Sequence, residues 1–311
     1  MQLLFLYKIF LFISLNRSII SLRSKNLYKN PTILNSNSKN ENQCIISSKN
    51  NNIYCNSSAK LFISENSFLN NKKLITISPG GFKGFYLLGI LTYLKENYDF
   101  DNFIFSGASA GSWNCLFMCY KGDPLEFALK LFESNIKKAK TITEFQICIK
   151  YNLLSNYKEE DFDLRRLFIG VTTLNKFIPK KNIFSEFNSL EDAINCCIAS
   201  SHIPFITGGI TNKYHNMFTF DGGFCDYPYL LNDNCILHVS PSMWSKINNS
   251  SANCIKRSIN TIIQFSEFFS LSKNNLIELF DDGYQDAKIH KTYLDELFKP
   301  QIVLNDDVIE F

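Results

Sequence analysis

A serine lies between two glycines in the segment Gly107-Ala108-Ser109-Ala110-Gly111. In this pattern the serine occupies a sharp turn between a strand and a helix, and its hydroxyl projects into open space. Bulkier residues in place of the glycines would collide with the neighbouring strand and helix. The helix that follows presents its positive N-terminal end to the serine, which favours alkoxide character. The pattern therefore predicts a nucleophilic Ser109.

A second glycine-rich turn, Gly80-Gly81-Phe82-Lys83-Gly84, also follows an apolar run. Glycines leave backbone N–H groups accessible to a ligand, and such donors suit the oxyanion that develops in acyl transfer. A phosphate-binding turn is one alternative, but the spacing of the dinucleotide-binding motif is not met. A plain tight turn is the other. The preceding Pro79 has no N–H, so Gly80 and Gly81 are the candidate donors.

The third chemical signal is Asp221, which ends an apolar run and precedes Gly222 and Gly223. An aspartate there can be held rigidly at the carboxyl edge of a sheet, although an ordinary Asp-Gly turn is the alternative. The order Ser109, Asp221, His238 also fits a Ser-Asp-His esterase. A histidine base protonates near pH 6.5, so we expect a Ser-Asp dyad to keep its rate as the pH falls through that value.

A sheet of parallel strands is needed to bring these turns together. Strands are predicted from short apolar or β-branched runs at 74–78, 102–105, 167–172, 183–187, 217–220 and 235–239. Helices are predicted at 85–96, 112–120 and 189–200, the last with Ser189 as its N-cap, and 274–298 reads as an amphipathic helix. Repeated strand–turn–helix units favour an α/β fold with a mostly parallel central sheet.

Composition excludes several other classes of protein. The 311 residues are 45% hydrophobic and 20% charged with a formal net charge of +3, which suits a sizeable core and argues against an extended nucleic-acid surface. Ten cysteines are too few for a disulfide scaffold, and their spacing indicates no metal site. Cys44 and Cys55 are candidates for a disulfide if the chain enters an oxidising compartment.

The chain is expected to have four parts. Residues 1–22 are apolar and are predicted to be a signal peptide, a membrane anchor or a surface-lying helix, which favours membrane or secretory association over a cytoplasmic location. Residues 23–73 are rich in Asn, Ser and Lys and are predicted to be a linker. Residues 74–298 form the predicted catalytic domain, and 299–311 are a tail.

In their order and spacing, the three motifs resemble those of the patatin-like phospholipases. Gly80 to Gly84 resembles the family's oxyanion loop, Gly107 to Gly111 its nucleophile elbow, and Asp221-Gly222-Gly223 its Asp-Gly-Gly motif. The segments 198–205 and Gly283-Tyr284-Gln285-Asp286-Ala287 are also similar to family segments. Residues 85–89 and 221–228 most resemble the branch that includes adipose triglyceride lipase and adiponutrin-type proteins.

The resemblance implies a three-layer α/β/α patatin-like fold and a carboxylic ester hydrolase of the phospholipase A or triacylglycerol lipase type. Asp221 would accept the proton of Ser109, the N–H groups of Gly80 and Gly81 would bind the oxyanion, and neither cofactor nor metal is implied. The expected partner is a lipid at a membrane or lipid surface, with no nucleic acid. Lys83 is a candidate contact for a lipid phosphate. Candidates to line an acyl groove are Phe82, Phe85, Trp113, Phe205 and Phe224.

One position departs from the family pattern. The family usually has three consecutive glycines in its oxyanion loop, and Pro79 replaces the first of them here. This substitution keeps open a second class of function, in which the protein binds lipid without catalysis.

Overall fold

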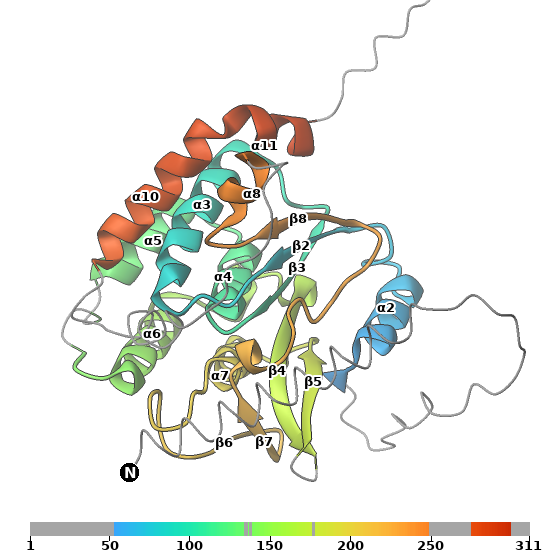
Figure 1. Ribbon diagram of the computed structural model, residues 1–311, viewed down its shortest axis with the longest axis vertical. Helices are drawn as coiled ribbons and strands as arrows, with labels where there is room; N and C mark the ends of the chain where they lie inside the picture. The colour runs from blue at the N-terminus through green and yellow to red at the C-terminus, as the bar shows by residue number, and fades with distance from the viewer. Residues whose placement is uncertain (1–52, 134–135, 137–138, 176–177, 249–274, 300–311) are drawn as a thin grey trace, which may run out of the picture. The chain divides into compact units, whose positions relative to one another are not determined.

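The computed structural model describes residues 53–133, 136, 139–175, 178–248 and 275–299. An eight-stranded sheet lies at its centre (Figure 1), in which β8, β2, β3 and β4 are parallel neighbours in that order. The remaining strands join β4 through antiparallel pairs. The strands are β1 (Ile53–Tyr54), β2 (Lys73–Ile77), β3 (Phe103–Ala108), β4 (Leu167–Asn175), β5 (Ile178–Phe184), β6 (Asn212–Tyr214), β7 (Met217–Phe220) and β8 (Cys235–Val239).

Helices cover both faces of the sheet, which confirms the expected three-layer α/β/α fold with a mostly parallel central sheet. The α-helices are α2 (Asn56–Glu65), α3 (Gly84–Asn97), α4 (Ala110–Cys119), α5 (Pro124–Glu133), α6 (Ile142–Asn156), α7 (Leu190–Ser200), α8 (Met243–Asn248), α10 (Leu276–Ile289) and α11 (Lys291–Phe298). Single 3₁₀ turns occupy η1 (Gly81–Lys83), η3 (Glu159–Asp161), η4 (Leu164–Arg166) and η5 (Gly222–Phe224).

Alternating side chains of the central strands pack into two separate hydrophobic cores, one on each face of the sheet. Ile75 and Phe105 pack in a large core with α3, α4, α7 and α10, whereas Leu74 and Ile104 pack in a smaller core with α2. Successive side chains of a strand point to opposite faces, so strands covered on both sides read as continuous apolar runs. This explains why β2 and β3 were predictable from short apolar runs.

The predicted linker is wrong for residues 53–73. β1 pairs with β5, and α2 buries Ala59 and Ile63, which lie one helical turn apart, against the smaller core together with Leu69. A few apolar residues at helical spacing are enough to cover one face of the sheet, although polar residues surround them in sequence. Residues 1–22 and Cys44 lie outside the described residues, so the leader and the Cys44–Cys55 pairing stay predictions.

The helix predicted at 274–298 is two helices, α10 and α11, which meet at His290. α10 crosses α3 at very close range. A Cβ atom on Gly89 would lie 1.9 Å from the carbonyl oxygen of Phe280, and one on Gly283 would lie 1.9 Å from that of Tyr86. The late glycine-containing motif therefore holds α10 against α3, the helix that leads away from the glycine-rich turn.

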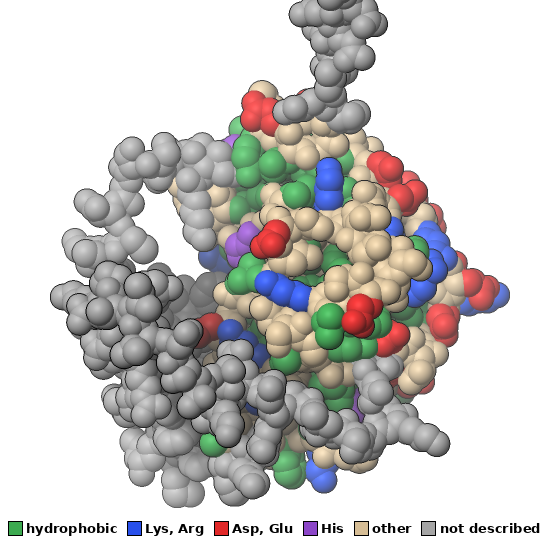
Figure 2. Space-filling view, turned by 90° about the vertical axis from the view of Figure 1, so that its right-hand side faces the viewer, with side chains coloured by type: hydrophobic (Ala, Val, Ile, Leu, Met, Phe, Trp, Pro, Cys, Tyr) green, Lys and Arg blue, Asp and Glu red, His purple; other side chains and the backbone are tan. Residues whose placement is uncertain are grey.

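On the face shown in Figure 2, the basic and acidic side chains of the described residues are interspersed rather than gathered by sign. None of the helices within the described ranges combines the length and apolarity needed to cross a membrane.

Candidate active site

Ser109 and Asp221 meet because two strands approach each other along β4 from opposite ends. β3 runs parallel to β4 and ends opposite Gly170, whereas β7 runs antiparallel to β4 and ends opposite Thr172. Ser109 directly follows β3, and Asp221 directly follows β7. The Ser109 Oγ donates a hydrogen bond to Asp221 Oδ2 at 2.6 Å. Asp221 thus reaches the carboxyl end of β3 from a strand of opposite direction, which its sequence did not predict.

The turn at Ser109 is strained and closely packed. Its φ of 53° is uncommon for a residue other than glycine and is typical of functional sites. A Cβ on Gly107 would lie 2.3 Å from the carbonyl oxygen of Gly111, and one on Gly111 would lie 2.1 Å from that of Ile77. The Ser109 N–H donates to Ser200 Oγ at 2.8 Å. These contacts confirm the steric reason for both glycines.

The Asp-Gly-Gly segment fixes the carboxylate by similar means. A Cβ on Gly222 would lie 2.5 Å from that of Ala108, so a larger residue would push β3 and this turn apart. The Gly223 N–H donates to Asp221 Oδ1 at 2.6 Å, and the Thr172 hydroxyl donates to the Asp221 carbonyl oxygen at 2.9 Å. The carboxylate therefore has one oxygen held by the backbone and the other directed at Ser109.

Burial raises the pKa of Asp221 to about 6, although the hydrogen bonds from Ser109 and Gly223 act to lower it. The side chain is only 5% exposed, so its charged form has lost most of its hydration. An aspartate with this pKa protonates in nearly the same range as histidine. With this pKa we expect the rate of a dyad to fall as the pH decreases below about 6, in place of the constant rate expected from the sequence, so a pH profile does not separate the dyad from a triad.

The glycine-rich turn presents backbone donors near Ser109. Gly81 has a φ of 53°, which favours glycine, and it lines the same pocket as Ser109. Among the described residues, the N–H groups of Gly80 and Gly81 have no acceptor. Gly80 does not line the pocket. Pro79 lies beside Gly223, where a Cβ would contact it at 3.4 Å, so the proline packs on the aspartate turn.

Ala110 is a further candidate donor that was not predicted from the sequence. It is the first residue of α4, lines the pocket, and has an N–H without an acceptor among the described residues. In nucleophile elbows the residue after the serine commonly contributes an oxyanion donor. The Gly-x-Ser-x-Gly pattern could itself have indicated this position.

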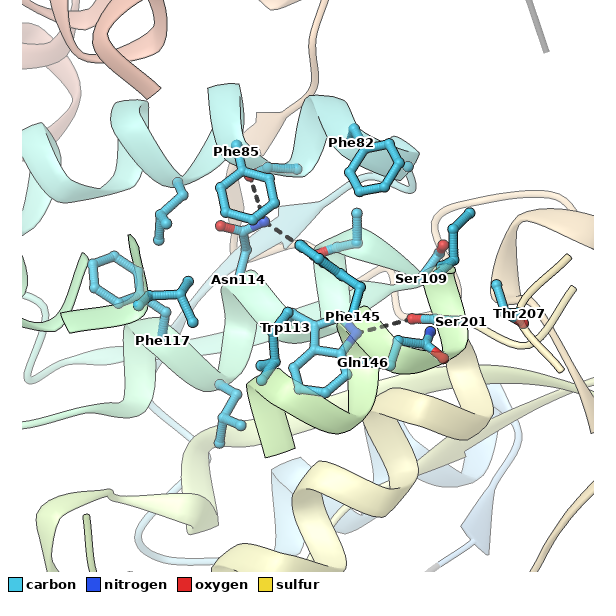
Figure 3. Close-up of a pocket in the computed structure, with 18 of the residues that line it drawn as sticks. Phe82, Phe85, Ser109, Trp113, Asn114, Phe117, Phe145, Gln146, Ser201 and Thr207 are labelled. Atoms are coloured by element: carbon cyan, nitrogen blue, oxygen red, sulfur yellow. Dashed lines mark hydrogen bonds between the residues drawn. The ribbon is translucent and has the colours of Figure 1, made fainter. Parts of the chain in front are cut away.

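An apolar pocket extends from Ser109 between the start of α3, α4, α5 and α6 (Figure 3). One face of α4 lines it from Ser109 to Phe117, about two helical turns or roughly 12 Å. Its shape and lining suit a hydrocarbon chain. The apolar lining consists of Phe82, Phe85, Leu88, Trp113, Leu116, Phe117, Phe127, Leu131, Ile142, Phe145, Ile149 and Leu153.

Of the aromatic residues predicted to line an acyl groove, Phe82, Phe85 and Trp113 do so, and Phe205 and Phe224 do not. α5 and α6, which supply much of the lining, were not predicted from the sequence. Lys83 is exposed and does not line the pocket, so its contact with a lipid phosphate stays a prediction.

His238 is not brought to this site. Its Nδ1 lies 2.8 Å from Thr76 Oγ1, where β8 pairs with β2, and it does not line the pocket. Ser109 and Asp221 are in direct contact, which leaves no place for a histidine between them. The geometry therefore does not support the Ser-Asp-His alternative.

Comparisons with known proteins place the chain in a family. The model of the patatin-like phospholipase family matches residues 75–231, half of the chain. The human protein 1-acylglycerol-3-phosphate O-acyltransferase PNPLA3 is 25% identical over 173 residues, which cover 52% of this chain and 36% of that protein. This similarity supports the adiponutrin-like branch, although the chain spans only about a third of that relative's length.

Among solved structures, the crystal structure of VipD from Legionella pneumophila aligns with 73% of this chain and 67% of its own, with a TM-score of 0.42 and 12% identity. The match to the family model, which covers all three motifs, identifies the chain as a member of the patatin-like phospholipase family.

Proposed function

We propose that this protein is a serine lipid acyl hydrolase that cleaves fatty-acyl esters of phospholipids or glycerolipids. The observation that carries the proposal is the direct hydrogen bond between Ser109 and Asp221, at one end of an apolar pocket. Family membership supports lipid hydrolysis in general. The substrate would be reached at a membrane or lipid surface.

In the proposed mechanism, Asp221 accepts the proton of Ser109 while the Ser109 Oγ attacks the ester carbonyl carbon. The N–H groups of Gly80 and Gly81, together with that of Ala110, stabilise the negative charge on the carbonyl oxygen. Collapse of this intermediate breaks the ester bond, and the leaving alcohol takes the proton from Asp221. A water molecule that gives a proton to Asp221 then attacks the acyl-enzyme, and the fatty acid leaves as Ser109 recovers its proton.

An aspartate is normally a weak base for a serine hydroxyl, because its ordinary pKa is near 3.9. Burial of Asp221 raises its pKa to about 6 and brings its basicity closer to that of the alkoxide. The 2.6 Å contact requires no rearrangement before proton transfer. Both features support a dyad that works without a histidine.

The test is hydrolysis of defined phospholipids, diacylglycerols and triacylglycerols by the full chain, with Ser109→Ala as the blank. We expect fatty acid release by the native protein and none above background by Ser109→Ala, because the variant lacks the attacking oxygen. The lipid class from which fatty acid is released fastest distinguishes a phospholipase A from a triacylglycerol lipase. If neither protein releases fatty acid above background from any lipid of the panel, the non-catalytic lipid-binding alternative is favoured.

A second candidate function is acyl transfer to an alcohol, which the name of the human relative, an O-acyltransferase, favours. The same acyl-enzyme would react with a lipid hydroxyl instead of water. Ser109 and Asp221 are each only 5% exposed, which restricts the approach of bulk water. The assay adds 1-acylglycerol-3-phosphate to a labelled acyl donor, and a diacyl product formed in excess of free fatty acid identifies transfer.

A further inference from the structure

Gln146 is a polar residue on the otherwise apolar, buried face of α6. The buried face of this helix carries Phe145, Ile149 and Leu153 at intervals of four residues, and Gln146 lies on the same face. Its side chain is 7% exposed and lines the apolar pocket. The amide is not among the fully buried unpartnered polar atoms, so it faces the hollow of the pocket, where an amide without a protein partner favours a polar ligand.

No protein group within the described ranges provides that hydrogen bond. Three other polar side chains of the pocket have at least one protein partner, although Asn114 Oδ1 has none: Ser201 accepts from Trp113 Nε1 at 3.0 Å, and Thr207 accepts from the Ile203 N–H at 2.7 Å. Asn114 donates to the Gly84 carbonyl oxygen at 3.1 Å. Gln146 has no hydrogen-bond partner among these residues, so both ends of its amide are available to a ligand.

The Gln146 amide lies at the reacting end of the pocket. Figure 3 shows it on the same side as Ser109 and Ser201, with Phe117 at the opposite end. One turn further along α6, Lys150 donates to Asn195 of α7 at 2.9 Å, so this face of α6 is turned toward α7. α7 ends at Ser200, whose Oγ accepts from the Ser109 N–H. A ligand bonded to Gln146 would therefore lie on the Ser109 side of the pocket.

We infer that Gln146 hydrogen-bonds a neutral oxygen of the substrate's glycerol moiety, a free hydroxyl or the adjacent ester oxygen, and so selects neutral glycerolipids over simple esters. An uncharged amide can both donate to and accept from a hydroxyl. Among the residues that line the pocket, Asp221 is the one ionisable side chain, so a phosphate would meet no positive charge there. This inference rests on the proposed function, because it identifies the alcohol half of the substrate cleaved at Ser109.

The first test measures binding without any chemical step. The full-length native protein is titrated calorimetrically with 1-O-octylglycerol and with octyl ethyl ether, neither of which has an ester to cleave. We expect the glycerol ether to bind more tightly, and Gln146→Met to weaken its binding roughly two- to twelve-fold, as expected for one hydrogen bond. Binding of octyl ethyl ether should change less than two-fold.

The second test measures hydrolysis of 1-octanoylglycerol and ethyl octanoate. Gln146→Met should raise KM for the glycerol ester and leave that for the ethyl ester nearly unchanged. Ile149→Ala is the matched control, because Ile149 lies in the same pocket on the same helix but has no polar group. That variant should affect both esters to a similar extent.

Thermal unfolding shows whether Gln146→Met changes the stability of the protein. Because Gln146→Met removes a buried amide without a protein partner, we expect its midpoint temperature to equal or exceed that of the native protein. Equal dissociation constants of the native protein for the two ethers would overturn the inference, as would a loss of several degrees in the variant. Failure of the hydrolase proposal is separately visible as native activity no greater than that of Ser109→Ala.

Discussion

The two ends of the pocket are built in different ways. At the reacting end, backbone contacts determine the geometry: Gly107, Gly111 and Gly222 each occupy a place where a Cβ would overlap a neighbouring atom. At the far end, apolar faces of α4, α5 and α6 meet through side chains alone, such as the rings of Phe117 and Phe127 at 5.2 Å. In the proposed mechanism, the chemistry therefore depends on close backbone approach, whereas we expect the choice of acyl chain to depend on side-chain volume.

The largest effect is expected from Asp221→Asn at the reacting end. An amide cannot accept the Ser109 proton, so we expect kcat/KM for ester hydrolysis to fall about 10²–10⁴-fold. His238→Ala is the control, because its ring contacts Thr76 and not the site, and it should keep most of the activity. Activity lost in the histidine variant and kept in the aspartate variant would reverse the assignment of the base.

The pH profile tests whether burial of the reacting end controls its base. Asp221 can act as a base only when it is ionised. Below its pKa of about 6, the fraction of molecules with an ionised Asp221 falls as the pH decreases. We expect kcat/KM to fall about ten-fold per pH unit below that value and to level off above it. The measurement uses a soluble ester between pH 4 and 8, with return to pH 8 as a check on unfolding. A rate that stays constant to pH 4.5 would show that Asp221 keeps an ordinary carboxyl pKa.

The smallest of the three effects is expected at the far end. Leu153 lies one helical turn before Tyr157, whose ring stacks on Phe127 at 5.1 Å, so Leu153→Phe should narrow the pocket there. We expect the ratio of kcat/KM for long-chain over short-chain esters to fall roughly ten-fold, within the range for small volume changes in apolar pockets. Comparison of butanoyl and hexadecanoyl esters measures the ratio. An equal loss on both esters would mean that the two ends are not independent.

The sequence predicted the parts of the fold with local signals. β2, β3, α3 and α4 were predictable because fully buried strands and helices read as apolar runs punctuated by glycine. Ser189 was predicted as the N-cap of α7, and its Oγ accepts from the Asp192 N–H at 3.1 Å. Each of these features depends on residues close together in the chain.

α6 was not predictable in the same way, because its helical period is blurred. Ile147 and Tyr151 are 46% and 69% exposed, so apolar residues occur on the outer face as well as on the face toward the pocket. Gln146 adds a polar residue to the inner face. Without a clean amphipathic pattern, α6 gave no clear signal in the sequence, although it lines part of the pocket.

The order of the three motifs along the chain was sufficient to identify the residues that could do the chemistry, since each motif combines a reactive group with the glycines that its turn requires. Only the tertiary structure decided how they meet. β7 pairs antiparallel with β4 and ends near the carboxyl end of β3, which pairs parallel with β4. The β4–β7 pairing joins segments far apart in the chain, and neither segment has a local sequence signal for it. The same burial that this pairing creates raises the pKa of Asp221, because a pKa depends on the groups packed around a carboxylate and not on its neighbours in sequence.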